Sequence, residues 1–141
     1  MNAAHTEMIQ ECSQGALTGT LTFPEIVGKL GKIGVERYHA DYSRHEITYY
    51  FPDGDSLVVA VPHPKYSTAI EFSASAVEAA VRQSQRNEHT YLDFLRKTMA
   101  AGCIGYFVQI TGRRVIYFGR NGDAYTEHFP SMTADANSSH L

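Results

Sequence analysis

The chain has 141 residues, of which 43% are hydrophobic and 19% are charged, with a formal net charge of −3. This composition is typical of one globular domain and excludes a generally basic, nucleic-acid-binding protein, because phosphate contacts need clustered Lys and Arg. No apolar run approaches the roughly 20 residues of a membrane-spanning helix, and MNAAHTEMIQ lacks the basic start and apolar core of a signal peptide. We therefore expect no membrane association and a cytoplasmic location.

Two helices are predicted first. The segment TEMIQECSQ places Cys12 on the apolar side of a helix. The second helix begins at Thr22, which forms a capping box with Glu25, and it ends at Gly34. Three strands follow, and Arg44-His45 and Asp53-Gly54 are predicted to form the tight turns between them.

The second half of the chain repeats this order. The segment SAVEAAVRQSQ predicts a helix in which Ser75 and Glu78 form a capping box. A second helix runs from Thr90, with Asp93 as its capping partner, to Gly102. The strands CIGYFVQI, RVIYFG and AYTEHF follow, and two-residue hairpin turns are predicted at 112–113 and 121–122.

An internal duplication explains the recurrence. Residues 22–55 align without gaps with residues 90–123, an offset of 68 positions. Extending the alignment to Pro62 and Pro130 gives eight identities in 41 positions. Roughly two or three would arise by chance for average composition. We therefore predict repeats at about 5–62 and 73–130.

The predicted architecture is α+β, with two tandem ααβββ repeats and antiparallel β-meanders. Residues 1–130 form a single domain, and the polar segment 131–141 is predicted to be a disordered tail. The pattern leaves open whether the six strands form one sheet or two. Helices are expected to cover one sheet face. Cys12 and Cys103 lack CxxC spacing and are predicted to be buried structural thiols.

Strand alternation with two-residue loops divides the side chains between two faces. The apolar face, assigned to the helices, comprises Tyr38, Ala40, Tyr42, Ile47, Tyr49, Val58, Tyr106, Val108, Ile110, Val115 and Tyr117. The opposite face comprises Arg37, His39, Asp41, Thr48, Tyr50, Leu57, Val59, Phe107, Gln109, Ile116, Phe118, Tyr125 and Glu127. This face is too rich in aromatic residues for plain solvent exposure, so we expect the other half, another subunit or a ligand to cover it.

His39 and Asp41 are the candidates for chemistry. They lie two residues apart on one strand and project to the same side, where Tyr50 is the predicted cross-strand neighbour of His39. An acid–base pair is one interpretation, because a carboxylate can orient and charge an imidazole. A zinc site would need three or four ligands, and only these two share a face, so no metal is predicted. A hydrogen-bonded polar patch at an interface is the third interpretation, and no motif predicts a cofactor.

The segments TFPEIVGKL, GVERYHAD and TYYFPDGD, in this order, resemble a small family of bacterial and prophage proteins sometimes labelled phage envelope protein. The resemblance covers nearly the whole chain apart from the tail. It implies a phage context, and it carries no established activity or cofactor.

Two functional hypotheses follow. The first is a non-enzymatic α+β protein that uses the mixed face to form a homo-oligomer or to bind a protein partner. Its contact residues would be Arg37, Phe107, Gln109, Phe118, Tyr125 and Glu127. The alternative is an enzyme or small-molecule-binding protein with a pocket over the same face, in which His39, Asp41, Tyr50 and Glu127 supply the polar groups.

Overall fold

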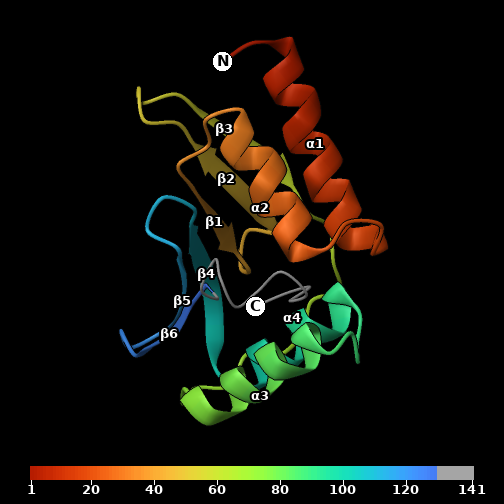
Figure 1. Cartoon of the computed structure of the whole chain (residues 1–141). Coiled ribbons are helices and arrows are strands. Elements are labelled where there is room, and N and C mark those ends of the chain that lie inside the picture. The colour runs from red at the N-terminus through yellow and green to blue at the C-terminus, as the bar shows by residue number, and fades with distance from the viewer. Residues whose placement is uncertain (130–141) are drawn as a thin grey trace.

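The computed structural model describes residues 1–129 (Figure 1). Its helices are α1 (Ala3–Thr18), α2 (Phe23–Lys32), α3 (Ala74–Gln85) and α4 (Tyr91–Ala100). Its strands are β1 (Arg37–Asp41), β2 (Glu46–Tyr50), β3 (Ser56–Ala60), β4 (Cys103–Gln109), β5 (Arg114–Gly119) and β6 (Ala124–His128). The chain is α+β, and its order of elements is consistent with two ααβββ units. The tail predicted at 131–141 lies outside the described residues.

The strands form one antiparallel sheet in the order β3-β2-β1-β4-β5-β6. This answers the question that the sequence left open, because β1 and β4 pair at the centre and join the two meanders. In their register His39 pairs with Phe107, its counterpart 68 positions later. The two meanders are therefore related by an approximate two-fold axis through this pair, an arrangement that is compatible with a duplication. The duplication itself stays a prediction.

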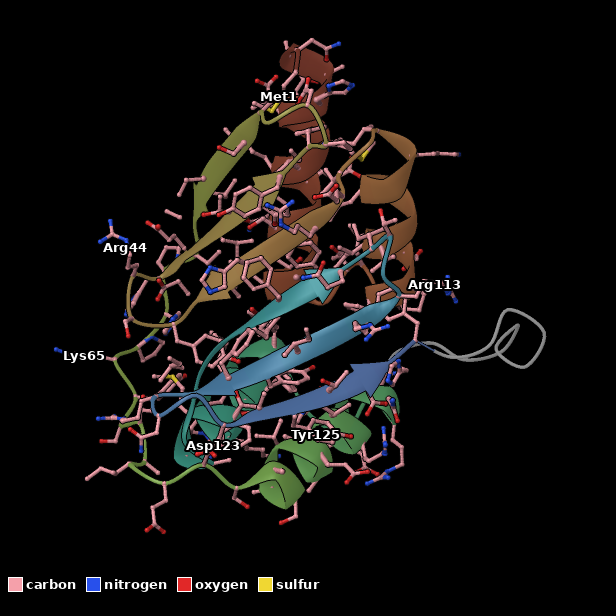
Figure 2. All side chains as sticks on the ribbon, turned by 90° about the vertical axis from the view of Figure 1, so that its left-hand side faces the viewer. Met1, Arg44, Lys65, Arg113, Asp123 and Tyr125 are labelled. Carbon is pink, nitrogen blue, oxygen red and sulfur yellow. The ribbon has the colours of Figure 1, made fainter. Side chains whose placement is uncertain are left out.

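All four helices lie on one face of the sheet (Figures 1 and 2). α1 packs on α2 and α3 packs on α4, so each meander has its own helical pair. Between helices and sheet lies the core, whose most deeply buried side chains include Ile9, Leu30, Val77, Val81, Leu95, Tyr49, Val108 and Val115. Cys12 and Cys103 are buried, as predicted. Within the described residues, no helix combines the length and apolar character needed to cross a membrane.

The helix boundaries confirm the local signals at α2 and α4. Thr22 accepts a hydrogen bond from the Glu25 amide at 3.3 Å, and the Glu25 carboxylate accepts one from the Thr22 amide at 2.8 Å. Thr90 and Asp93 form the same box, with both distances 3.1 Å. Each box satisfies two amides that the first helical turn leaves without partners.

The capping box predicted at Ser75 and Glu78 was wrong. α3 begins earlier, and its N-cap is Ser73, whose hydroxyl accepts from the Ala76 amide at 3.2 Å. Ser75 therefore lies in the first helical turn. Glu78 instead pairs with Arg82 one turn along the helix, at 3.0 Å.

The β2–β3 hairpin has a different register from the predicted one. Phe51 and Asp55 close a three-residue loop, with the Phe51 amide donating to the Asp55 carbonyl at 2.9 Å. Gly54 takes the left-handed conformation in this loop, with φ of 95°. The extra loop residue shifts the pairing by one position, which exchanges the two faces of the strand. Leu57 and Val59 therefore face the helices and Val58 faces away, the reverse of the prediction.

The β5–β6 hairpin repeats this difference. Gly119 and Asp123 close its three-residue loop, and Tyr117 pairs with Tyr125. Because Tyr117 is a core residue on the helical side, Tyr125 and Glu127 lie on that side too. Their predicted place on the opposite face was wrong. The loops at 42–45 and 110–113 have four residues, which preserves the face assignment of β1, β2, β4 and β5.

Candidate functional site

The sheet has one face without helices, which Figure 2 views from the front. We call it the open face, and the strand registers arrange its side chains in three rows that run across all six strands. The arginine row comprises Ser56, Tyr50, Arg37, Gln109, Arg114 and His128. The central row comprises Val58, Thr48, His39, Phe107, Ile116 and Thr126. The acidic row comprises Ala60, Glu46, Asp41, Gly105, Phe118 and Ala124.

Aromatic side chains gather at the middle of the open face. The Phe107 ring stacks on the His39 imidazole with a centroid distance of 4.5 Å and an interplanar angle of 9°. Tyr50 lies 6.4 Å from Phe107 on one side, and Phe118 packs edge-on at 6.3 Å on the other. All four rings are half-buried by one another. The structure thus brings together four of the residues predicted for a site, around Phe107.

The two outer rows carry opposite charges. Arg37 lies over the Tyr50 ring, 4.3 Å from its centroid, and is paired with Glu36. In the acidic row Glu46 is paired with Arg44 at 3.1 Å. Asp41 accepts hydrogen bonds at Oδ1 from the amides of Ser43 and Arg44, at 3.1 and 3.3 Å.

Arg114 and Asp41 remain without an ionic partner among the residues of the face. Among residues 1–129, the Arg114 guanidinium donates only to the Gly112 carbonyl, at 3.3 Å. The second carboxylate oxygen of Asp41, Oδ2, has no hydrogen-bond partner in the part of the chain described. The arginine row is therefore basic and the acidic row keeps an available carboxylate oxygen.

A hollow of about 650 Å³ lies beside Asp41, lined by His39, Asp41, Gly105, Phe118 and Arg120 among others. Gly105 lies between Asp41 and Phe118 in the acidic row. Because glycine has no side chain, the space between these two neighbours is left empty. The glycine is also needed for strand pairing, since a Cβ there would lie 2.4 Å from the Ala40 carbonyl oxygen. The alternation pattern assigned Gly105 to neither face and did not predict the hollow.

His39 and Asp41 share the hollow but do not form a hydrogen-bonded pair. The imidazole stacks on Phe107, and the Asp41 carboxylate holds the turn that follows β1. Within residues 1–129, no three His, Cys, Asp or Glu side chains come close enough to hold a metal ion. His45, at the other end of that turn, stacks instead on His63 with a centroid distance of 3.9 Å.

Tyr125 and Glu127 belong to a different network, between β6 and α3 (Figure 2). The Glu127 carboxylate accepts from Arg82 at 2.7 Å, Gln85 at 3.3 Å and the Tyr125 hydroxyl at 2.6 Å. Burial acts to raise the pKa of Glu127, but these hydrogen bonds, led by that from Arg82, hold the pKa below its ordinary value. Burial and the hydrogen bond to Glu127 raise the pKa of Tyr125 to about 12. These two residues stabilise the fold rather than line the open face.

The helical side holds a second hollow, a cavity of about 410 Å³ between the α1–α2 pair and the α3–α4 pair. Tyr38, Tyr106 and Tyr117 lie on its floor. Sequence analysis assigned these tyrosines to the core and did not predict a cavity. One signal in the sequence could have indicated the cavity. Buried tyrosine hydroxyls need hydrogen-bond partners, and this core face contains many tyrosines.

No protein-family model matches the chain, and no curated protein matches it. The resemblance to phage-associated proteins therefore stays a prediction.

Proposed function

We propose that the protein is a non-enzymatic binding module whose open face binds a second copy of the same chain. The observation that carries the proposal is the arrangement of this face, with half-buried aromatic rings at its centre between a basic and an acidic row. Apolar side chains gathered on one uncovered surface are typical of interaction sites, and a polar rim around them is typical of interfaces.

The charges favour one symmetry for the dimer. Two identical faces packed against each other are related by a two-fold axis that lies between the sheets. If this axis runs along the strands, each arginine row meets the partner's arginine row, which is repulsive. If it runs along the rows, the arginine row meets the partner's acidic row, and Arg37 approaches the partner's Asp41. We therefore expect the second arrangement, in which opposite charges meet.

The surroundings of Asp41 would allow it to contact an arginine of the partner. Its Oδ1 accepts from the turn amides, Oδ2 has no hydrogen-bond partner among residues 1–129, and Asp41 lines the hollow beside Gly105. The hollow can take the guanidinium group of the partner's Arg37, and the carboxylate would then form a charge-assisted hydrogen bond. In exchange Arg37 would give up part of its contact with Glu36.

The interface is small. Six strands about 4.8 Å apart and roughly five residues long span a planar area of roughly 500 Å². Stable interfaces bury about 800 Å² of accessible surface on each partner, so this face belongs at the lower end of that range. We therefore expect a dissociation constant in the micromolar range rather than an obligate dimer.

The alternative hypothesis, acid–base or metal chemistry at His39 and Asp41, has less support. Asp41 uses its carboxylate to hold a turn, and His39 uses its ring face to stack. Neither contact supplies the hydrogen-bonded orientation that an acid–base pair needs.

Sedimentation velocity over micromolar concentrations tests the dimer. The wild-type chain should shift from monomer to dimer, and Phe107→Lys should remain a monomer because it places a charge at the centre of the face. Ile70→Lys is the matched control, since Ile70 is 70% exposed away from the sheet strands. A wild-type chain that stays monomeric at the highest concentration would refute the proposal.

A double-mutant cycle tests the symmetry. Arg37→Gln and Asp41→Asn each remove one charge, and Asn keeps an oxygen acceptor for the turn amides. If Arg37 meets the partner's Asp41, each change should weaken dimerisation roughly threefold to tenfold, and the double variant should be little weaker than either. Fully additive effects would exclude this arrangement. Native mass spectrometry of the same samples, purified without chelator, would reveal a heterologous partner or a bound metal.

A further inference from the structure

The cavity on the helical side has the size of a ligand site. Its volume of about 410 Å³ falls within the range of small-molecule pockets. The end of α1, the start of α2 and the α3–α4 connection form its walls, and β1, β4 and β5 form its floor. It lies on the opposite side of the sheet from the open face. An inference about this cavity is therefore independent of the proposed dimer.

Two tyrosines on the floor have hydroxyl groups without a partner in the described part of the chain. Tyr38 is 5% exposed and Tyr117 is 3% exposed. Neither hydroxyl has a hydrogen-bond partner among residues 1–129, whereas the neighbouring Tyr91 and Tyr106 hydroxyls bond each other at 2.8 Å. No described side-chain oxygen or nitrogen is both fully enclosed and unpartnered. Both hydroxyls must therefore reach open space. Both residues line this cavity, and Tyr38 also lines a smaller hollow beside Cys12 and Tyr49.

These hydroxyls are neutral groups. Burial raises the pKa of Tyr38 and that of Tyr117 well above the ordinary value for tyrosine. At neutral pH each phenol therefore carries its proton and can both donate and accept a hydrogen bond. An occupant of the cavity would find these two polar positions on a floor that is otherwise formed by Tyr106, Val108 and Val115.

The wall of the cavity carries no formal charge. Its described lining includes no Lys, Arg, Asp or Glu, and His89 is its only imidazole. Lys97 donates to Nδ1 of His89 at 3.0 Å, so Nε2 carries the ring proton and donates to the Ser84 hydroxyl at 2.8 Å. Burial, followed by the charge of Lys97, lowers the pKa of His89.

This arrangement argues against nucleophilic catalysis at Ser84. A general base must accept the proton of the hydroxyl, and here the imidazole nitrogen nearest Ser84 already holds a proton. The pair serves as a neutral part of the wall. A charged ligand would lose its hydration here without gaining an opposite charge.

We propose that this cavity binds an uncharged, largely aromatic small molecule that carries a hydroxyl or carbonyl group. The aromatic floor and the side chains of Leu21, Phe23 and Phe94 would contact its ring system. The Tyr38 and Tyr117 hydroxyls would hydrogen-bond its polar group. Because the wall is neutral, anions and cations should bind more weakly than uncharged molecules.

A fluorescence titration with N-phenylnaphthylamine, an uncharged aromatic probe, tests whether the cavity binds. The full-length protein should saturate with one probe per chain. Ala16→Trp, which fills the cavity from α1, should abolish binding, and Ala79→Trp, at an exposed position of α3, should leave it unchanged. Absence of saturable binding to the folded wild-type protein, or equal binding to the Ala16→Trp variant, would overturn the proposal.

Competition by three related compounds tests the chemistry and remains informative if the Ala16→Trp variant does not fold. Naphthol should displace the probe roughly threefold to tenfold more tightly than naphthalene, and naphthalenesulfonate should compete least. In the variant with both Tyr38→Phe and Tyr117→Phe, which keeps the shape of the floor, the preference for naphthol should disappear. An unchanged preference would show that the two hydroxyls do not bind the ligand.

Discussion

Glu127 illustrates how one side chain can depend on a contact that only the fold creates. The residue comes from β6, and its ion-pair partner, Arg82, comes from α3, 45 positions earlier in the chain. Burial of a carboxylate is unfavourable without hydrogen bonds, and the three donors around Glu127 compensate for it. The carboxylate thereby fastens α3 to the edge strand of the sheet.

This network predicts a pH dependence of stability. The pKa of Glu127 is lower in the folded protein than its ordinary value of 4.5, so the folded chain binds fewer protons than the unfolded chain. The stabilisation is therefore present above the ordinary pKa and is lost as the pH falls through the folded one.

Glu127→Gln should remove about 1 kcal/mol of unfolding free energy at pH 7, a modest value because Arg82 is 37% exposed. Urea unfolding of the wild type and the variant at pH 7, 5, 4 and 3 should show the difference shrinking towards acid. Glu7→Gln, at an exposed position of α1, is the control. A difference that stays constant with pH would contradict the role of the charge.

At the scale of elements, the junction between β1 and β4 is the contact on which the single sheet depends. It joins the two meanders, and Gly105 allows the strands to approach. A side chain at this position would meet the backbone of β1, which cannot move aside as a flexible side chain could. The same glycine opens the hollow beside Asp41, so one residue serves both the fold and the open face.

Gly105→Ala should therefore destabilise the protein by about 1–3 kcal/mol, measured by urea unfolding. Gly28→Ala is the matched control, because it lies in α2 with nothing within 4 Å of an added Cβ. That change should stabilise by about 0.5–1 kcal/mol through helix propensity. Equal effects of the two substitutions would mean that β1 and β4 do not approach as closely as described.

At the scale of the whole molecule, the sheet separates two surfaces of different chemistry. One side carries the charged rows and the aromatic centre of the open face, and the other carries helices that enclose an uncharged cavity. A dimer through the open face would leave the entrance to the cavity unobstructed on the outer, helical side. Assembly and ligand binding are therefore separable in this architecture.

Dimerisation predicts a melting temperature that depends on concentration. Because only the folded chain associates, a tenfold increase in protein concentration should raise the wild-type melting temperature by roughly 2–4 °C. Scanning calorimetry should detect this shift. The Phe107→Lys variant should melt at one temperature at all concentrations, and a shift of the wild-type size in that variant would place the interface elsewhere.

Local signals in the sequence determined the helices, the capping boxes at Thr22 and Thr90, the α+β class and the faces of the four central strands. These features depend on hydrogen bonds and side-chain alternation within a few residues. Only the tertiary structure decided the rest: the pairing of β1 with β4, the registers of β3 and β6, and the contact between Arg82 and Glu127. A turn signal such as Asn121-Gly122 predicts a hairpin but not its exact loop length. One additional loop residue places Tyr125 and Glu127 on the helical face instead of the predicted opposite face. The loop length depends on the register in which the strands pair across the whole sheet, and a local sequence pattern does not determine that register.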